Sequence, residues 1–471
     1  MSLSPNYRPD PRLPRLGPEF ADPVESADFP QTLLRFRNQR AAATVGLETL
    51  SDDEWRGHFG RFEPLPGNLE APLAQRYHGH QFRVYNPDLG DGRGFTFAQM
   101  REVGSDRLLD LGTKGSGPTP WSRQGDGRLT LKGGVREVLA TAMLEAQGVN
   151  TSKTFSLIET GENLQRNDEP SPTRSAVMVR LSHGHIRFGT FQRQAYLQKP
   201  DQITQLVNYV IETYYPGLAG AANPRAALLE AVIVRTAAMA AGWMAAGFVH
   251  GVLNTDNMNI TGESFDYGPY RFLPRNDPNF VAAYFDQNGL YSFGRQPEAV
   301  FWNLQQLAGC LALGEDDQEP LVAALNTFGG VYRSALATAM LKRLGIKPGA
   351  PEADVALAGS AFKALSVGGD VLRWEPFFFD WFCGEADRAL ASPRRELYEA
   401  PEFAEFRSLI SQREGDRPER LKADYFAKAD PQELLIDEIE AIWSAIAAKD
   451  DWSVFAQKLV DLETARTAYA L

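Results

Sequence analysis

The stretch His250-Gly251-Val252-Leu253-Asn254-Thr255-Asp256-Asn257 is followed shortly afterwards by Asp266-Tyr267-Gly268. One side chain of each segment, Asn257 in the first and Asp266 in the second, offers an oxygen ligand of the kind that Mg²⁺ prefers in proteins. Because protein-bound Mg²⁺ usually keeps phosphates and waters in its shell, this spacing favours a nucleotide site.

Protein kinases provide a frame for this spacing. They place His-Arg-Asp, four free positions and Asn before Asp-Phe-Gly; the first Asp accepts the substrate proton, while the Asn and the second Asp hold magnesium. On that frame His250 and Asn257 fall into register, and Val252 stands where the proton acceptor should be. Because a valine cannot accept a proton, the metal-holding half of the site is present and the phosphoryl-transfer half is not. We interpret the stretch as a nucleotide-binding site that serves a different chemistry.

Length and charge limit the classes of protein to consider. With 471 residues the chain is too long for one ordinary core, so we expect two lobes or domains plus extensions. The net charge of -12 argues against a nucleic-acid partner, whose phosphates demand a basic face. The two cysteines, Cys310 and Cys383, provide no disulfide framework, so we expect a reducing, cytoplasmic compartment.

Two segments bear on export and membranes. Residues 1–20 mix arginines with prolines and offer no apolar core of a secretory signal. The segment from Ala226 to Val249 is apolar but carries Glu230 and Arg235, and its uncharged part, residues 236–249, suits a buried helix better than a membrane span. We therefore expect no membrane partner.

Four regions follow one another along the chain. In the second region, short apolar runs predict strands, and the apolar spacing from Gly134 to Gln147 predicts one helix among them. The regions are an N-terminal wrap (1–88), a strand-rich small lobe that binds nucleotide (89–199), a helical large lobe with the catalytic loop (200–390) and a C-terminal helical extension (391–471). This order predicts an α+β fold of the bilobal, protein-kinase-like kind.

Two glycine-rich runs in the small lobe, residues 89–94 and 112–117, are candidate phosphate contacts. Neither matches the P-loop pattern, so a Walker-type NTPase is disfavoured, and each run alone is more often a plain hairpin turn. Lys114 at the end of a predicted strand favours the phosphate interpretation, and Glu137 follows it at the spacing of a kinase lysine and its helix glutamate. Glu137 lies opposite the apolar stripe of its helix, however, where a solvated carboxylate is usual.

A series of motifs, taken in order, closely resembles the selenoprotein O family over residues 75 to 275 and more weakly beyond. The series is Leu111-Gly112-Thr113-Lys114-Gly115-Ser116-Gly117, Ser122-Arg123, Gly125-Asp126-Gly127-Arg128, Arg136-Glu137, His185-Ile186-Arg187-Phe188-Gly189, the run from His250 to Ile260, and Asp266-Tyr267-Gly268. The resemblance implies a protein-kinase-like fold that binds ATP in an inverted orientation. It also implies protein adenylylation, in which AMP moves from ATP onto Ser, Thr or Tyr hydroxyls of proteins and pyrophosphate leaves.

The resemblance further implies roles for individual residues. Asp256 would accept the proton of the substrate, one residue before the metal-binding Asn rather than in the kinase position. Asn257 and Asp266 would hold Mg²⁺, with Mn²⁺ as an alternative. The nucleotide contacts would come from Gly90, Gly92, Arg93, Lys114, Asp126, Gly127, Arg180, Arg187 and Asp266, with Glu137 paired to Lys114.

The sequence departs from the family pattern at three places. Lys132-Gly133-Gly134 replaces the usual basic and small hydroxyl residues, which leaves the cap of the predicted helix open. Arg83-Val84-Tyr85 stands where glycine and tryptophan are more usual. The end of the sequence carries neither cysteine nor the selenocysteine of eukaryotic members, so we expect no terminal redox switch.

Two other clusters receive a structural interpretation. His78-Gly79-His80 and His183-Gly184-His185 look like metal pairs, but no Cys or carboxylate cluster stands beside them at ligand spacing, so hydrogen-bonded or exposed loop histidines are favoured over zinc. The aromatic run 377–382 is interpreted as packing between helices.

Three functions remain open on these observations. The first is adenylylation, the second is ordinary phosphoryl transfer, and the third is a catalytically inactive pseudokinase that only binds nucleotide. Val252 disfavours the second function because its position needs a base. The intact Lys114, Asn257 and Asp266 argue against the third.

Overall fold

An eight-stranded sheet lies at the centre of the structure, a computed structural model that describes residues 3–167 and 169–471. The strand order is β1-β3-β6-β7-β10-β9-β2, with β8 paired to β10, and all of these pairings are antiparallel. The strands are β1 (Ala21–Pro23), β2 (Leu33–Arg37), β3 (Leu73–Gln75), β6 (Thr96–Arg101), β7 (Leu108–Lys114), β8 (Leu129–Thr130), β9 (Lys153–Leu164) and β10 (Thr173–Ser182).

The segment before residue 89 completes this sheet and covers one of its faces. It supplies β1 and β2, which end the strand order, and the helices α1 (Gln39–Ala43) and α2 (Asp52–Gly60). Trp55 of α2 is fully buried, stacks on Phe155 at 4.8 Å between ring centroids, and donates its Nε1–H to Ser156 Oγ at 2.9 Å. The residues expected to form a wrap therefore share a core with the strands of the expected small lobe.

The helix α3 (Leu131–Ala146) packs against the opposite face, on β9 and β10. It begins three residues before the predicted start because the hydroxyl of Thr130 caps it, accepting from the backbone N–H of Gly133 at 3.1 Å. Gly134 permits a close approach to the sheet, since a Cβ there would lie 2.4 Å from Leu157 Cδ1. This tight packing brings α3 beside the end of β7.

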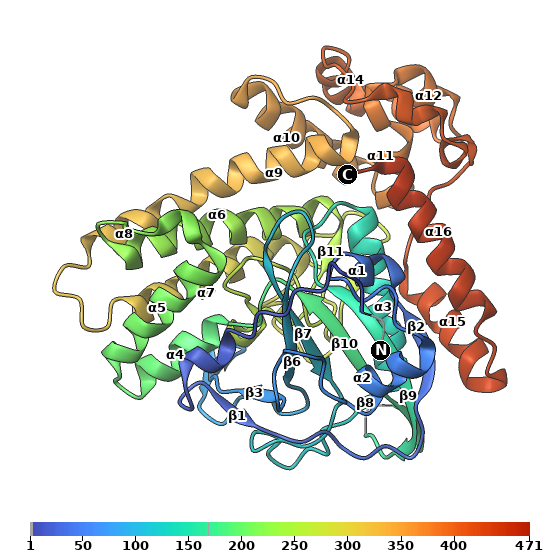
Figure 1. Cartoon of the computed structure of the whole chain (residues 1–471). Helices are drawn as coiled ribbons and strands as arrows, with labels where there is room; N and C mark the ends of the chain where they lie inside the picture. Colours follow the sequence, from blue (N-terminus) through green and yellow to red (C-terminus); the bar gives the residue numbers. More distant parts are fainter. Residues whose placement is uncertain (1–2, 168) are drawn as a thin grey trace.

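The remaining helices form the second part of the molecule; in Figure 1 most of them lie to the left of and above the sheet, and α15 and α16 lie to its right. They are α4 (Phe188–Tyr196), α5 (Pro200–Tyr214), α6 (Pro224–Ala245), α7 (Gln296–Leu311), α8 (Glu319–Asn326), α9 (Phe328–Leu344), α10 (Pro351–Val367), α11 (Trp374–Asp380), α12 (Ala386–Ala391), α13 (Arg395–Glu399), α14 (Ala404–Ile410), α15 (Ile436–Lys449) and α16 (Ser453–Tyr469). Two short hairpins accompany them, β4 (Gly79–Gln81) with β5 (Val84–Asn86) and β11 (Phe248–Val249) with β12 (Arg271–Phe272). The α+β class predicted from the sequence is confirmed.

The helix α6 lies in the middle of this helical part and packs against α7, α8 and α9. By length and composition it is the one described helix that could cross a membrane, but 61% of its most apolar window is buried inside the molecule. A core helix of a soluble globular protein has these properties, as expected from the sequence.

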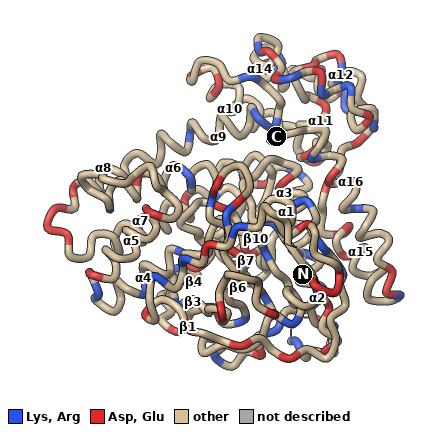
Figure 2. The backbone as a smooth tube through the Cα atoms, in the orientation of Figure 1, with Lys and Arg blue, Asp and Glu red and all other residues tan. Residues whose placement is uncertain are grey.

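Three further observations complete the fold. The aromatic run predicted to pack between helices does so, because Phe377 and Phe378 of α11 are fully buried and Phe377 contacts Phe406 of α14 at 5.0 Å between centroids. Cys310 and Cys383 are both buried and free. Figure 2 shows acidic and basic residues interspersed over the chain, so the net charge of -12 is spread over many elements.

Candidate active site

A cavity of about 650 Å³ lies where the end of β7, the loop 89–94 and the catalytic-loop stretch meet. Predicted residues that line it are Gly90, Gly92, Arg93, Lys114, Asp126, Gly127, Arg180, Arg187, Asp256 and Asp266. Glu137 and Asn257, also predicted, stand outside the lining; Glu137 contacts Lys114 of the lining, and Asn257 follows Asp256 in the chain. The structure therefore gathers residues that are far apart in the sequence around one cavity.

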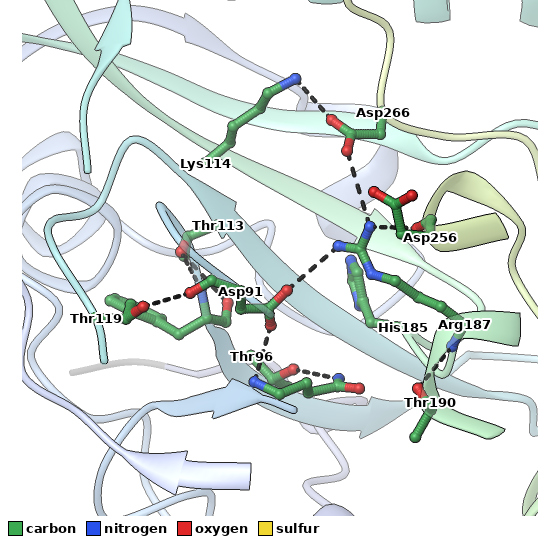
Figure 3. A network of polar contacts seen from close by, with 12 residues as sticks. Asp91, Thr96, Thr113, Lys114, Thr119, His185, Arg187, Thr190, Asp256 and Asp266 are labelled. Atoms are coloured by element: carbon green, nitrogen blue, oxygen red, sulfur yellow. Dashed lines mark hydrogen bonds and ion pairs between the residues drawn. The ribbon is translucent and has the colours of Figure 1, made fainter. Parts of the chain in front are cut away.

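Three cations surround the carboxylate of Asp266. Lys114 Nζ lies 2.7 Å from Asp266 Oδ1, Arg180 Nη2 lies 3.6 Å from the same oxygen, and Arg187 Nη1 lies 3.8 Å from Oδ2. Lys114 and Arg187 reach the carboxylate from opposite sides in Figure 3. The sheet brings two of these cations together, because Lys114 pairs with Met178 and Arg180 with Gly112, which places both side chains on one face of neighbouring strands.

Lys114 also forms a buried ion pair with Glu137 of α3. The two side chains are 5% and 3% exposed, so Glu137 is not the solvated carboxylate that its place opposite the apolar stripe suggested. The reason is that α3 is buried on more than one side, between the sheet and α16, and Glu137 lies on a side that meets Lys114 at the end of β7. A stripe of apolar residues marks only one of these buried faces.

The surroundings of Asp266 hold it in the ionised form. Burial raises the pKa of its carboxyl, but Lys114, Arg180 and Arg187 outweigh burial and keep the pKa well below its usual value. The backbone at Asp266 is left-handed, with φ at 63°. Such a conformation is uncommon for a residue other than glycine and occurs often at functional sites.

Both arginines carry buried donors that no described residue satisfies. These are Nε and Nη1 of Arg180 and Nε of Arg187. A buried charged donor without a partner is costly to a folded protein. Because guanidinium groups bind phosphates with several donors at once, a phosphate group in the cavity would satisfy these atoms.

Asp256 stands on the one-turn helix η3 (Thr255–Asn257) and faces the same cavity. Its side chain is 8% exposed, and Oδ1 is buried without a hydrogen-bond partner among the described residues. Arg187 Nη1 donates to the backbone carbonyl of Asp256 at 2.8 Å, rather than to its carboxylate. Burial raises the pKa of the Asp256 carboxyl to about 6, with Arg187 opposing the shift. A carboxylate of this pKa can accept a proton near neutral pH.

Asn257 points toward the loop that precedes it. Its Nδ2 donates to the backbone carbonyl of Val252 at 2.9 Å, which leaves the amide oxygen as the atom able to bind a metal. His250 joins this loop to the segment of Asp266, because its Nε2 lies 3.1 Å from the carbonyl of Phe265. The residues that match the kinase spacing, His250, Asn257 and Asp266, therefore lie on neighbouring backbone segments.

The glycines of the loop 89–94 permit close packing of that loop. A Cβ at Gly90 would lie 2.4 Å from Trp121 Cγ, and one at Gly92 would lie 2.8 Å from the Trp121 carbonyl oxygen. Asp91, between these glycines, is a site residue that the sequence analysis missed. Its Oδ1 lies 3.3 Å from Arg187 Nη2, and its Oδ2 accepts from the backbone N–H of Gln75 at 3.0 Å. The signal that could have identified Asp91 was its position inside the glycine-rich run 89–94, which was already a candidate for phosphate contact.

The rim of the cavity holds a second set of ion pairs. Asp126 lies on the loop 121–128 and accepts from Arg166 Nη1 at 2.7 Å and from the backbone N–H of Arg128 at 2.9 Å. Arg166, which the sequence analysis did not single out, also lines the cavity. The carboxylate of Asp126 is therefore held by protein groups at the rim rather than among the cations around Asp266.

Hydrogen-bonded or exposed side chains were predicted for all four histidines of the two pairs, and three of them are hydrogen-bonded through the ring; His183 is instead buried beside Tyr214. His78 Nδ1 lies 2.9 Å from Tyr85 Oη, His80 Nδ1 accepts from Gln192 Nε2 at 2.7 Å, and His185 Nδ1 lies 3.3 Å from Asp110 Oδ2.

Comparison with known proteins assigns the family. The model of the family described as "Protein adenylyltransferase SelO" matches residues 3–463. The chain belongs to the SelO family. It is similar to the "Protein nucleotidyltransferase YdiU" of Synechocystis sp., with 44% identity over 98% of each chain. The YdiU of Trichodesmium erythraeum is 43% identical, over 96% of this chain and 97% of its own. The YdiU of Vibrio cholerae is 39% identical, over 71% of this chain and 67% of its own. As a member of the SelO family, the chain is a protein nucleotidyltransferase.

Proposed function

We propose that the protein moves AMP from ATP onto Ser, Thr or Tyr hydroxyls of protein substrates and releases pyrophosphate. The cluster of buried cations around Asp266, with its unsatisfied arginine donors, is the observation that carries the proposal. We also propose that the sheet with α3 is the small lobe, and the helical part the large lobe, of a protein-kinase-like fold with the four regions expected from the sequence.

The nucleotide would bind with its β- and γ-phosphates among Lys114, Arg180 and Arg187. These cations are all buried, since the side chains of Lys114, Arg180 and Arg187 are 5%, 5% and 7% exposed. The α-phosphate would then lie toward Asp256, which lines the same cavity. This is the inverted orientation, because a kinase needs the γ-phosphate beside its acceptor.

Two oxygen ligands fit a magnesium ion. The Asp266 carboxylate stays ionised because of the cations around it, and the Asn257 amide oxygen is left over by the hydrogen bond of its nitrogen. Among the described residues no group of three or more His, Cys, Asp or Glu gathers as a metal site, so phosphate oxygens and waters would complete the shell, as is usual for Mg²⁺. A Mg²⁺ bound there supplies charge stabilisation to the departing pyrophosphate.

Asp256 would act as the general base. Its carboxylate takes the proton of the acceptor hydroxyl while the oxygen attacks the α-phosphorus. The bond between that phosphorus and the bridging oxygen breaks, AMP stays on the protein hydroxyl, and Lys114, Arg180 and Arg187 stabilise the charge of the pyrophosphate that leaves. Val252, in the kinase position, has no part in this reaction. We propose a cytoplasmic location and no nucleic-acid or membrane partner, on the grounds of charge and cysteine usage.

The test is to incubate the protein and a protein substrate with ATP labelled at either the α- or the γ-phosphate. We expect protein-bound label from the α-phosphate alone. Label from the γ-phosphate alone would show an ordinary kinase, and label from neither would show a nucleotide-binding pseudokinase.

A further inference from the structure

Three hydrogen bonds form a closed ring beside the catalytic loop. The backbone N–H of His80 donates to Thr255 Oγ1 at 2.7 Å. Thr255 Oγ1 donates in turn to Gln192 Oε1 at 2.5 Å. Gln192 Nε2 donates to His80 Nδ1 at 2.7 Å, which returns the ring to the residue where it began. The ring joins three elements that are far apart in the sequence, namely β4, α4 and η3.

Two of the three members of the ring are buried, and His80 is partly buried. Thr255 is fully buried and Gln192 is 3% exposed. The Thr255 hydroxyl both accepts and donates, so its removal would leave two buried polar groups without a partner. His80 accepts at Nδ1, so its imidazole is neutral with the proton on Nε2, and burial lowers its pKa. Trp302 of α7 packs edge-on against the imidazole, at 5.1 Å between centroids.

The same elements touch Asp256, the residue after Thr255. Gly79 precedes His80 in β4, and a Cβ at Gly79 would lie 3.1 Å from Asp256 Oδ1. Arg187 precedes α4 and donates to the Asp256 carbonyl. A single turn such as η3 has little hydrogen bonding of its own to fix it. Contacts from β4 and α4 therefore decide where this turn, and the Asp256 carboxylate on it, can lie.

We propose that the Thr255 hydroxyl, held by His80 and Gln192, is a positioning group that fixes the direction of the Asp256 carboxylate toward the acceptor hydroxyl. This inference rests on the proposed role of Asp256 as general base. The hydroxyl acts through Asp256 and has no role in binding the nucleotide, whose phosphates meet Lys114, Arg180 and Arg187. A small misplacement of a reacting group can cost about 10²-fold in rate, so a distinct kinetic effect is expected.

The first test compares two substitutions at one position. Thr255→Val keeps the shape of the side chain and removes the hydroxyl, and we expect kcat for AMP transfer to fall about 10- to 100-fold while the affinity for ATP changes by less than about 2-fold. Thr255→Ser keeps the hydroxyl, and we expect kcat within about 5-fold of the parent protein. Thr261→Val is the matched control, because Thr261 is buried on the same loop and its hydroxyl donates to Asn259 Oδ1 at 3.0 Å, away from the cavity lining. We expect its kcat within about 2-fold.

The second test separates positioning from general loosening of the loop. In an Asp256→Ala background, Thr255→Val should lower the residual rate by less than about 2-fold, because the group that the hydroxyl positions is already gone. Two results would overturn the inference. One is an equal loss of kcat in Thr255→Val and Thr261→Val. The other is that Thr255→Val lowers the rate in the Asp256→Ala background by as much as it does in the parent protein. Gln192→Met removes the two hydrogen bonds that join α4 to the ring, so we expect the same fall in kcat. This variant replaces Thr255→Val in the test if Thr255→Val does not fold. A full rate in Asp256→Ala would instead refute the general base itself, so the two failures are distinguishable.

Discussion

Asp256 and Asp266 line one cavity, yet their surroundings drive their pKa values in opposite directions. Burial raises the pKa of both carboxyl groups. At Asp266 three cations reverse the effect and hold the pKa well below its usual value. At Asp256 the neighbouring Arg187 donates to the backbone carbonyl, and burial prevails with a pKa of about 6.

The difference shows that neighbours, rather than residue type, set the pKa values of the two carboxyl groups. A carboxylate that remains ionised throughout the physiological range suits the binding of a metal cation. A carboxylate that titrates near neutral pH suits the transfer of a proton. Kinases place both groups on one catalytic frame, and here the proton-accepting position of that frame carries Val252. The comparison therefore predicts that the two aspartates fail in different ways.

The largest effect is expected from Asp266→Ala. The substitution removes the proposed charged ligand of the metal and the carboxylate that Lys114, Arg180 and Arg187 share, so we expect AMP transfer to fall by about 10⁴-fold or more at saturating magnesium. Incorporation of label from α-labelled ATP measures it. Asp380→Asn is a control elsewhere in the molecule, because Asp380 is also buried against an arginine, Arg394. A normal rate in Asp266→Ala would contradict the assignment.

The next effect sharpens the contrast between the two residues. In Asp256→Ala we expect kcat to fall by about 10² to 10⁴-fold, the usual worth of a general base, with ATP affinity nearly unchanged. Calorimetric titration of ATP into each variant measures the affinity. If Asp256→Ala lost affinity for ATP together with its rate, Asp256 would also serve in binding the nucleotide and the comparison would fail.

The sequence predicted the members of this site better than their contacts. Spacing and resemblance named Lys114, Arg180, Arg187, Asp256 and Asp266, and all five line the cavity. This was possible because the chemistry of phosphate and metal binding restricts the residue types. The α+β class also followed, because strands and helices differ in their apolar period.

What escaped prediction depends on packing between distant segments. The burial of Glu137 follows from its contact with Lys114 at the end of β7, which no local pattern of α3 reveals. The ring of His80, Gln192 and Thr255 joins residues 175 and 63 positions apart. Asp91 was missed for a different reason: it stands between Gly90 and Gly92, and the run was interpreted through the backbone of its glycines rather than through this side chain. Periodicity describes one element at a time and gives no register between elements.

The pH profile provides a third and smaller test. The raised pKa of Asp256 means that its base form is lost as the pH falls through about 6. We expect kcat/KM to fall about tenfold for each pH unit below that value and to be level just above it. Asp266, with its lowered pKa, should add no second fall in this range. The fall should vanish in the residual activity of Asp256→Ala; its persistence there would assign the titration to another group.

The smallest effect is expected where the kinase residue is restored. Val252→Asp puts a carboxylate in the kinase position, but with the γ-phosphate among Lys114, Arg180 and Arg187 that carboxylate has no γ-phosphoryl group within reach of its acceptor. We therefore expect no transfer of label from γ-labelled ATP and AMP transfer within about 5-fold of the parent protein. Val252→Ala is the control for loss of the valine, because the backbone carbonyl that accepts from Asn257 is kept in both variants. Transfer of the γ-phosphate in Val252→Asp alone would show that the nucleotide binds in the ordinary kinase orientation. Asp256 would then no longer face the reacting phosphate, and the contrast between the two aspartates would lose its functional meaning.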